Sequence, residues 1–247
     1  MKIGLLGTGY MGKTLARKLA AAEHEVKVAN SRSPACIMAD VLETGASATT
    51  AEEALTDVDI VILSMPATGF EKVRSSVAKI PIDTVVIDTS NYAAMRDGRN
   101  PEIDAGKVES EWVQDYFGRP IVKAWNSIGS DSFARKAQPL GHPERIAIPV
   151  AGDVPRHREV AMALVDDTGF DAFDAGVIAE SWRQQPGSPV YCTDLAYDEI
   201  GPALASAERH RLARRSEIAL AVITERMGLG IPPDAEWGTK IFRALFS

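Results

Sequence analysis

The chain has 247 residues, of which 45% are hydrophobic and 25% charged, the profile of a globular protein with one large domain or one domain and an appendage. Its formal net charge of -7 argues against non-specific nucleic-acid binding. No apolar run approaches the ~20 residues that span a bilayer, so we expect no membrane insertion. Two cysteines are too few for a disulfide framework or a zinc site, and the N-terminus lacks a signal-peptide pattern, so a cytoplasmic protein is expected.

Strand-like and helical segments alternate from the first residue onward. Helices are predicted over Tyr10–Ala22 and Arg158–Asp167, where apolar residues recur at spacings of three and four. Short, continuously apolar runs predict buried strands at Ile3–Leu6, Glu25–Ala29, Asp59–Ser64, Thr84–Asp88, Ile121–Ala124, Ala147–Ala151 and Phe170–Phe173. This alternation predicts an α/β fold, a Rossmann-type doubly wound sheet that is mostly parallel and covered by helices on both faces.

The pattern changes near residue 180. Glu180–Pro202 is rich in Gly, Pro, Ser and Tyr and shows no strand alternation. A helix with an apolar stripe is predicted over Leu204–Met227, and a last helix after Pro232-Pro233. We therefore expect a nucleotide-binding domain over residues 1–180 and a small helical appendage over residues 181–247. Because the stripe is too long to leave in water, it is expected to pack on its own domain or on a second subunit, and we predict a homodimer through the C-terminal helices.

A glycine-rich motif directly follows the first predicted strand and opens the first predicted helix. It matches GxGxxG and reads Gly7-Thr8-Gly9-Tyr10-Met11-Gly12. The first glycine allows a tight turn, the second lets the backbone approach a pyrophosphate, and the third lets helix and strand pack closely. The free N–H groups of the first helical turn then face the negative charge. The alternative is a glycine-rich turn without a ligand.

The end of the second predicted strand indicates which dinucleotide is bound. An NAD site has an Asp or Glu there to accept the ribose hydroxyls, whereas this chain has Asn30-Ser31-Arg32-Ser33. No carboxylate repels a phosphate at this place, and Arg32 offers a charged fork between two hydroxyl donors. The sequence therefore predicts NADP(H) rather than NAD(H). The alternative is that Asn30–Ser33 is a plain polar loop.

Three further strand ends carry polar or tightly turned residues. Ser64-Met65-Pro66 is expected to line the adenosine and ribose side of the cofactor, and Asn91 and Asn126 to hydrogen-bond the nicotinamide ribose or amide. Lys123 is a candidate catalytic residue that would orient substrate or donate a proton, and Asn126 is its candidate companion. The alternative for Lys123 is a cap on an exposed strand edge. Strand alternation places Lys123 and Trp125 on one face and Ala124 and Asn126 on the other.

Together these segments resemble the NADPH-dependent F420 reductases, also called F420-dependent NADP oxidoreductases. The resemblance covers roughly residues 1–180 and extends to the reductase domain of the STEAP ferric reductases. It is carried by GLLGTGYMGKTLARKLA with VANSR, VVIDTSNY with RDG, and PIVKAWNSI with PVAGD. It implies that NADPH is bound through Thr8, Tyr10, Met11, Ser31 and Arg32, and that a deazaflavin or flavin ring stacks against the nicotinamide.

The leading functional hypothesis is an oxidoreductase that transfers hydride between NADP(H) and F420, FMN, FAD or a similar acceptor. Such a transfer requires two aligned rings and no dedicated acid or base, which fits the lack of catalytic motifs. Trp182, Tyr191 and Gly187–Asp194 would help to close the acceptor pocket, although domain packing is the alternative for Trp182. No histidine pair has metal-ligand spacing, so no metal is expected.

Two other functions stay open. One is a reductase of the β-hydroxyacid dehydrogenase or pyrroline-5-carboxylate reductase type acting on a small carbonyl or imine. Those families use a larger helical domain for substrate than this chain provides after residue 180. The other is a non-catalytic NADPH sensor whose helices signal to a partner.

Overall fold

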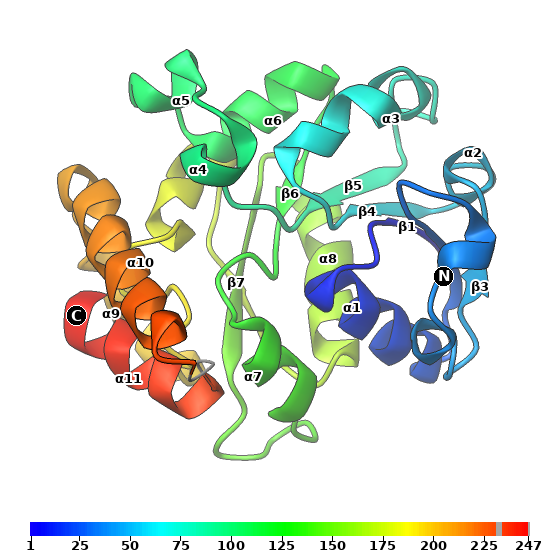
Figure 1. Cartoon of the computed structure of the whole chain (residues 1–247). Coiled ribbons are helices and arrows are strands. Elements are labelled where there is room, and N and C mark those ends of the chain that lie inside the picture. Colours follow the sequence, from blue (N-terminus) through cyan, green and yellow to red (C-terminus); the bar gives the residue numbers. More distant parts are fainter. Residues whose placement is uncertain (231–233, 247) are drawn as a thin grey trace.

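The computed structural model describes residues 1–230 and 234–246, and its centre is an eight-stranded sheet (Figure 1). The strand order is β3-β2-β1-β4-β5-β6-β7-β8. Neighbouring strands are parallel except β6 and β7, which are antiparallel. The strands are β1 (Lys2–Leu6), β2 (Glu25–Ala29), β3 (Ser47–Ala48), β4 (Ile60–Leu63), β5 (Val85–Asp88), β6 (Val122–Lys123), β7 (Ala147–Gly152) and β8 (Asp171–Asp174). The predicted Rossmann-type, mostly parallel sheet is confirmed.

Helices cover both faces of the sheet, as Figure 1 shows. One face packs against α1 (Tyr10–Ala21), α7 (Ser130–Arg135) and α8 (Pro155–Asp167) in a single hydrophobic cluster. The other face packs against α2 (Ala51–Ala54), α3 (Phe70–Val77) and α6 (Glu109–Phe117) in a second cluster. The chain runs outward from β1 to β3 and then returns to β4, so the order reverses between β1 and β4. In open parallel sheets the crevice at such a reversal binds the ligand.

Short helical turns join the main elements. Two of them, α4 (Ala94–Asp97) and α5 (Pro101–Asp104), lie between β5 and α6. The 3₁₀ turns are η1 (Pro34–Cys36), η2 (Ala39–Val41), η3 (Ala67–Gly69), η4 (Ile178–Gln184) and η5 (Arg209–Arg211). The predicted domain boundary at residue 180 falls inside η4. The division into two domains stays a prediction.

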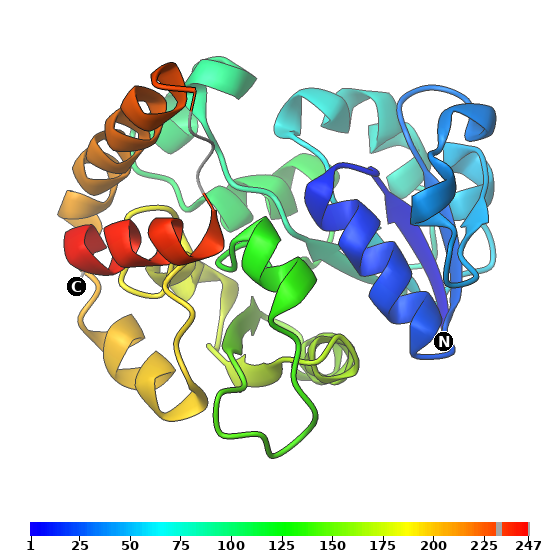
Figure 2. The same cartoon turned by 60° about the horizontal axis from the view of Figure 1, so that its bottom comes forward.

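The C-terminal segment is helical, and it lies at the opposite end of the molecule from α1 (Figure 2). Its helices are α9 (Tyr197–Ala205), α10 (Leu212–Gly228) and α11 (Ala235–Phe246). The single helix predicted over Leu204–Met227 is wrong, because α9 ends at Ala205 and α10 begins at Leu212. Between them the chain turns to bury Ala207 against Trp182 and Leu212. Pro232-Pro233, predicted to precede the last helix, lie outside the described residues.

In the part of the chain that the structure describes, no helix is long and apolar enough to cross a membrane. Over the same residues, no group of three His, Cys, Asp or Glu side chains is arranged to hold a metal ion.

Candidate functional site

The turn between β1 and α1 depends on its glycines for two different reasons. Gly7 has a φ of 109°, and a Cβ there would lie 2.1 Å from the Ser64 carbonyl oxygen. A Cβ on Gly12 would lie 1.9 Å from the Gly7 carbonyl oxygen. A Cβ on Gly9 would have no atom of the described residues within 4 Å beyond its chain neighbours and its own helix. The fold therefore requires Gly7 and Gly12, whereas Gly9 leaves open space above the turn, as a pyrophosphate site requires.

The first turn of α1 suits an anion. Gly9 is the N-cap and contributes no side-chain hydrogen bond, and the first turn contains no acidic residue. Backbone N–H groups at such a helix start have no intrahelical partner, and the helix dipole favours negative charge there. Thr8 and Met11 are half-buried, while the Tyr10 side chain is 86% exposed. Contacts of these three residues with a cofactor stay predictions.

The predicted 2′-phosphate loop follows β2 and faces solvent. The Asn30 side-chain oxygen accepts a hydrogen bond of 2.8 Å from the Arg32 backbone N–H, which fixes the turn. Ser31, Arg32 and Ser33 are exposed. Among the described residues Arg32 forms no ion pair, so its guanidinium is free to pair with a phosphate. Asn30 shapes the loop, and contact of Ser31, Arg32 and Ser33 with a 2′-phosphate stays a prediction.

The turn after β4 packs directly on the glycine turn. The carbonyl of Ser64 approaches Gly7, and the Ser64 backbone N–H donates to the Leu6 carbonyl at 2.8 Å. Met65 is half-buried and Pro66 is exposed. Ser64–Pro66 thus lies beside the predicted pyrophosphate position, and its contact with adenosine and ribose stays a prediction.

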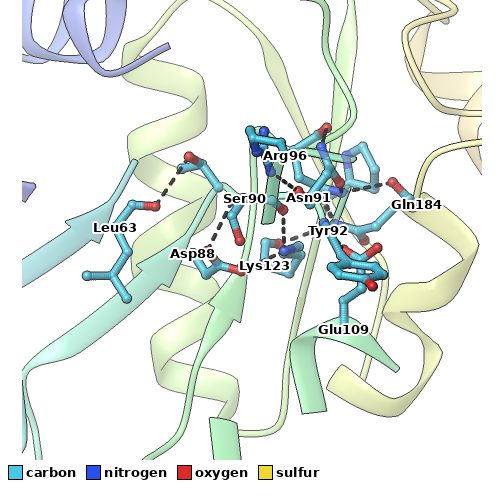
Figure 3. A network of polar contacts seen from close by, with 12 residues as sticks. Leu63, Asp88, Ser90, Asn91, Tyr92, Arg96, Glu109, Lys123 and Gln184 are labelled. Carbon is cyan, nitrogen blue, oxygen red and sulfur yellow. Dashed lines mark hydrogen bonds and ion pairs between the residues drawn. The ribbon is translucent and has the colours of Figure 1, made fainter. Parts of the chain in front are cut away.

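A buried ion pair joins the ends of β5 and β6 (Figure 3). The Lys123 ammonium donates to the Asp88 carboxylate at 2.6 Å and to the Ser90 carbonyl at 2.5 Å. Both charged side chains are fully buried. The alternative of Lys123 as a cap on an exposed edge is wrong, because β6 lies between β5 and β7. Lys123 instead fixes the turn after β5, where a cofactor would pass.

Asn126 belongs to a second set of contacts at this edge. Its side-chain amide donates to Asn91 Oδ1 at 3.1 Å and to the Gln184 carbonyl at 2.9 Å, and its Oδ1 accepts from Gln184 Nε2 at 2.8 Å. The Asn91 amide in turn donates to the Asn126 carbonyl at 2.8 Å. With their polar atoms bonded to protein groups, Lys123, Asn91 and Asn126 have positioning roles in this geometry. Their direct contact with substrate or nicotinamide stays a prediction.

The predicted alternation along residues 123–126 is wrong. β6 ends at Lys123, and Trp125 has a φ of 57°, which rotates its side chain away from the face that alternation assigns. Trp125 packs in the cluster that contains Val122 and Ala124. Strand geometry cannot be extended past the last hydrogen-bonded residue, and here the strand is only two residues long.

Residues 182–192, which precede α9, pack beside the edge formed by the ends of β5 and β6. Trp182 packs with Val108, Ala207 and Leu212, which favours the packing interpretation. The Tyr191 ring lies 6.1 Å from the ring of Phe242 in α11. Burial raises the pKa of the Tyr191 hydroxyl well above 10, and it raises the pKa of the neighbouring Cys192 thiol to about 12. Neither group carries a charge near neutral pH.

Sequence reasoning missed Glu109 as a site residue. It opens α6, its side chain is 8% exposed, and its Oε2 accepts a 3.0 Å hydrogen bond from the Tyr92 backbone N–H. Burial raises the pKa of its carboxyl to about 7, although the Lys123 ammonium opposes the shift. A carboxylate at a helix start ordinarily faces solvent, so no signal in the sequence marks this one as buried.

Comparison with known proteins extends this picture. Residues 2–92 match the model of the family described as NADP oxidoreductase coenzyme F420-dependent. The Escherichia coli K12 protein YjhV is 57% identical over 95 residues, which cover 38% of this chain and 57% of YjhV. The match therefore spans little more than half of that relative.

Solved structures share the fold over more of the chain. The hypothetical protein SMa0349 from Sinorhizobium meliloti has a TM-score of 0.66 at 25% identity, over 79% of this chain and 95% of that chain. A protein from Arthrobacter sp. FB24 whose name assigns it as an F420-dependent NADP reductase has a TM-score of 0.60 at 20% identity, over 73% of this chain and 87% of that chain.

Proposed function

We propose, on the premise that residues 2–92 belong to the F420-dependent NADP oxidoreductase family, that this protein transfers hydride between NADP(H) and a deazaflavin, a flavin or a similar acceptor. The observation that carries the proposal is the pairing of two features at one sheet edge. Gly9 leaves space above a helix start without a side-chain cap. Beyond β2, where a carboxylate would exclude NADP(H), stands Arg32, which forms no ion pair with any described residue.

The chain's own residues would hold the cofactor in three places. The first turn of α1 would bind the pyrophosphate, Ser31–Ser33 would bind the 2′-phosphate, and the turn after β4 would line the adenosine and ribose side. The turn after β5 would line the path of the nicotinamide half. When bound, NADPH supplies the hydride. Lys123 would hold the β5 turn still through Asp88 and Ser90, so that the two rings meet at a fixed separation.

An acceptor panel tests the proposal. NADPH oxidation is followed by absorbance at saturating NADPH with F420, FMN, FAD or a small cyclic imine, and NADPH binding is measured separately by calorimetry. We expect binding of NADPH and oxidation by at least one acceptor. Tight NADPH binding without oxidation by any of them would contradict the enzyme and favour the sensor, and absence of NADPH binding would contradict both.

We also propose that two copies associate through the C-terminal helices. Leu220 and Met227 of α10 are 46% and 59% exposed. Burying such side chains in a symmetric contact would remove apolar area from water. Sedimentation equilibrium at micromolar concentration should give twice the chain mass, whereas the monomer mass would contradict the dimer.

A further inference from the structure

A cavity of about 340 Å³ lies between α3, the α4–α5 segment and α6. Its volume lies at the lower end of the range for small-molecule sites. The cavity reaches Ala67 and Thr68, just after β4, and Ser90, just after β5. Ala67 and Thr68 belong to η3, which directly follows the β4 turn that packs on Gly7 through Ser64, so the cavity and the proposed cofactor site lie on neighbouring segments of the chain.

Aromatic rings form much of the cavity wall. Phe70, Tyr92 and Trp112 all line it, and the rings of Phe70 and Trp112 are stacked with centroids 6.4 Å apart. Aromatic faces carry negative potential and attract cations, most strongly when both are shielded from water.

Among the charged residues that line the cavity, Glu109 stands apart. Asp97 pairs with Arg96 at 2.8 Å, Glu102 pairs with Lys107 at 2.8 Å, and Arg99 pairs with Asp104 at 2.9 Å. Glu109 forms no ion pair within the described residues, and its single hydrogen bond there comes from Tyr92. Figure 3 shows it beside Tyr92. Its other oxygen, Oε1, accepts no hydrogen bond from the described residues, and Glu109 lines the cavity, so this carboxylate is available to a ligand there.

From this arrangement we propose that the cavity binds a small organic cation, the charge class of a cyclic iminium acceptor or of its amine product, with the Glu109 carboxylate as its counter-ion and the aromatic rings as its walls. The redox part of the inference rests on the proposed function for NADPH as the hydride donor, and it names a small iminium rather than a flavin as the acceptor. Hydride from NADPH would form a C–H bond at the iminium carbon, the C=N π pair would move to nitrogen, and NADP⁺ and a neutral amine would result. The amine would then take a proton from water.

Binding of a cation beside Glu109 should become tighter as pH rises. Its carboxyl must lose a proton to pair with a cation, so affinity should rise from about pH 6 to about pH 8, across its pKa of about 7. Burial opposes the shift at Asp97, but hydrogen bonds and the Arg96 charge still lower its pKa. The hydrogen bond to Asp97 raises the pKa of Arg96, and burial raises that of Tyr191, so these three do not titrate in the same interval. The charged or titratable groups that act on Glu109 are Lys123, Asp88, Asp97, Arg96 and Tyr191.

Calorimetric titration of the full chain with pyrrolidine at pH 8 tests the site. We expect Glu109→Gln to weaken pyrrolidine binding about tenfold or more, the loss expected for one charge-assisted contact. Glu111→Gln, one helix position away from the lining and equal in charge change, should bind as the unaltered protein does. Neutral cyclopentanol should bind about tenfold or more weakly than pyrrolidine.

Several results would overturn the inference. They are no binding of pyrrolidine, equal affinity for cyclopentanol, which would indicate a neutral hydrogen-bonding site, or unchanged affinity in Glu109→Gln. The pH series on the unaltered protein gives an independent check if the variant fails to fold, since flat affinity from pH 6 to pH 8 contradicts a role for Glu109.

The two proposals fail in different ways. Loss of pyrrolidine binding with normal NADPH binding contradicts the cation site alone, and loss of NADPH binding with normal pyrrolidine binding contradicts the proposed function alone. With both ligands bound, NADPH oxidation by 1-pyrroline that falls in Glu109→Gln supports the acceptor class. Absence of oxidation by 1-pyrroline contradicts that class.

Discussion

The two ends of the sheet edge that would bind the cofactor are formed by different kinds of groups. At the β1–β2 end the site consists of backbone and exposed side chains, with Gly9 open above the turn and Arg32 in solvent. At the β5–β6 end it consists of buried polar side chains, Lys123 with Asp88 and Asn126 with Gln184. Substitutions at the first end should therefore change ligand binding with little effect on folding. Those at the second end should change stability as well.

Gly9→Val should produce the largest effect on binding. A Cβ there has no described atom within 4 Å beyond its chain neighbours and its own helix, so the fold should be retained, but the side chain would occupy the pyrophosphate's space and abolish NADPH binding. Gly12→Val is the contrasting variant, since its Cβ would collide with the Gly7 carbonyl and should destabilise the protein by about 1–3 kcal/mol or more. Calorimetry measures the loss of NADPH binding, and thermal unfolding measures the loss of stability. Normal NADPH binding by Gly9→Val would contradict a pyrophosphate site above the β1–α1 turn.

Lys123→Met should lower the free energy of unfolding by about 3–5 kcal/mol, because it leaves the buried Asp88 carboxylate without its partner. The exposed pair of Lys2 with Asp57 supplies the control, and Lys2→Met should lower the free energy of unfolding far less, because solvent screens that pair. Urea denaturation measures both. Equal losses of unfolding free energy in the two variants would contradict the expectation that the buried pair at the β5–β6 end contributes more to stability than an exposed pair.

Glu109→Gln should alter how stability depends on pH. The folded-state pKa of Glu109, about 7, lies above that of an unfolded Glu, so the folded protein holds this proton more tightly. Its contribution is present at low pH and is lost as pH rises through about 7, a change of about 2 kcal/mol between about pH 5 and about pH 8. Urea denaturation at both pH values should show this decline in the unaltered protein and little of it in the variant. An identical decline in both would place the titration elsewhere.

The same contrast explains what could be predicted from sequence. The β1–α1–β2 unit was predictable because its turn, helix start and strand ends are fixed by residues close together in the chain. Lys123 was recognised as a candidate, but its burial depends on Asp88 and on β7, which are distant in sequence. Glu109 and Gln184 carried no local signal, since their roles arise from contacts between segments that only the fold brings together. The break at Ala207 was missed because it depends on burial against Trp182.

The central claim is that Arg32 recognises the 2′-phosphate of NADP(H), and calorimetric titration of Arg32→Ala with NADPH and with NADH tests it most directly. A charge-assisted contact contributes about 1.5 kcal/mol or more, so NADPH should bind about tenfold or more weakly while NADH affinity stays the same. Arg156→Ala, which removes an exposed arginine of α8, should change neither affinity. Equal weakening for both dinucleotides, or none for NADPH, would contradict the account.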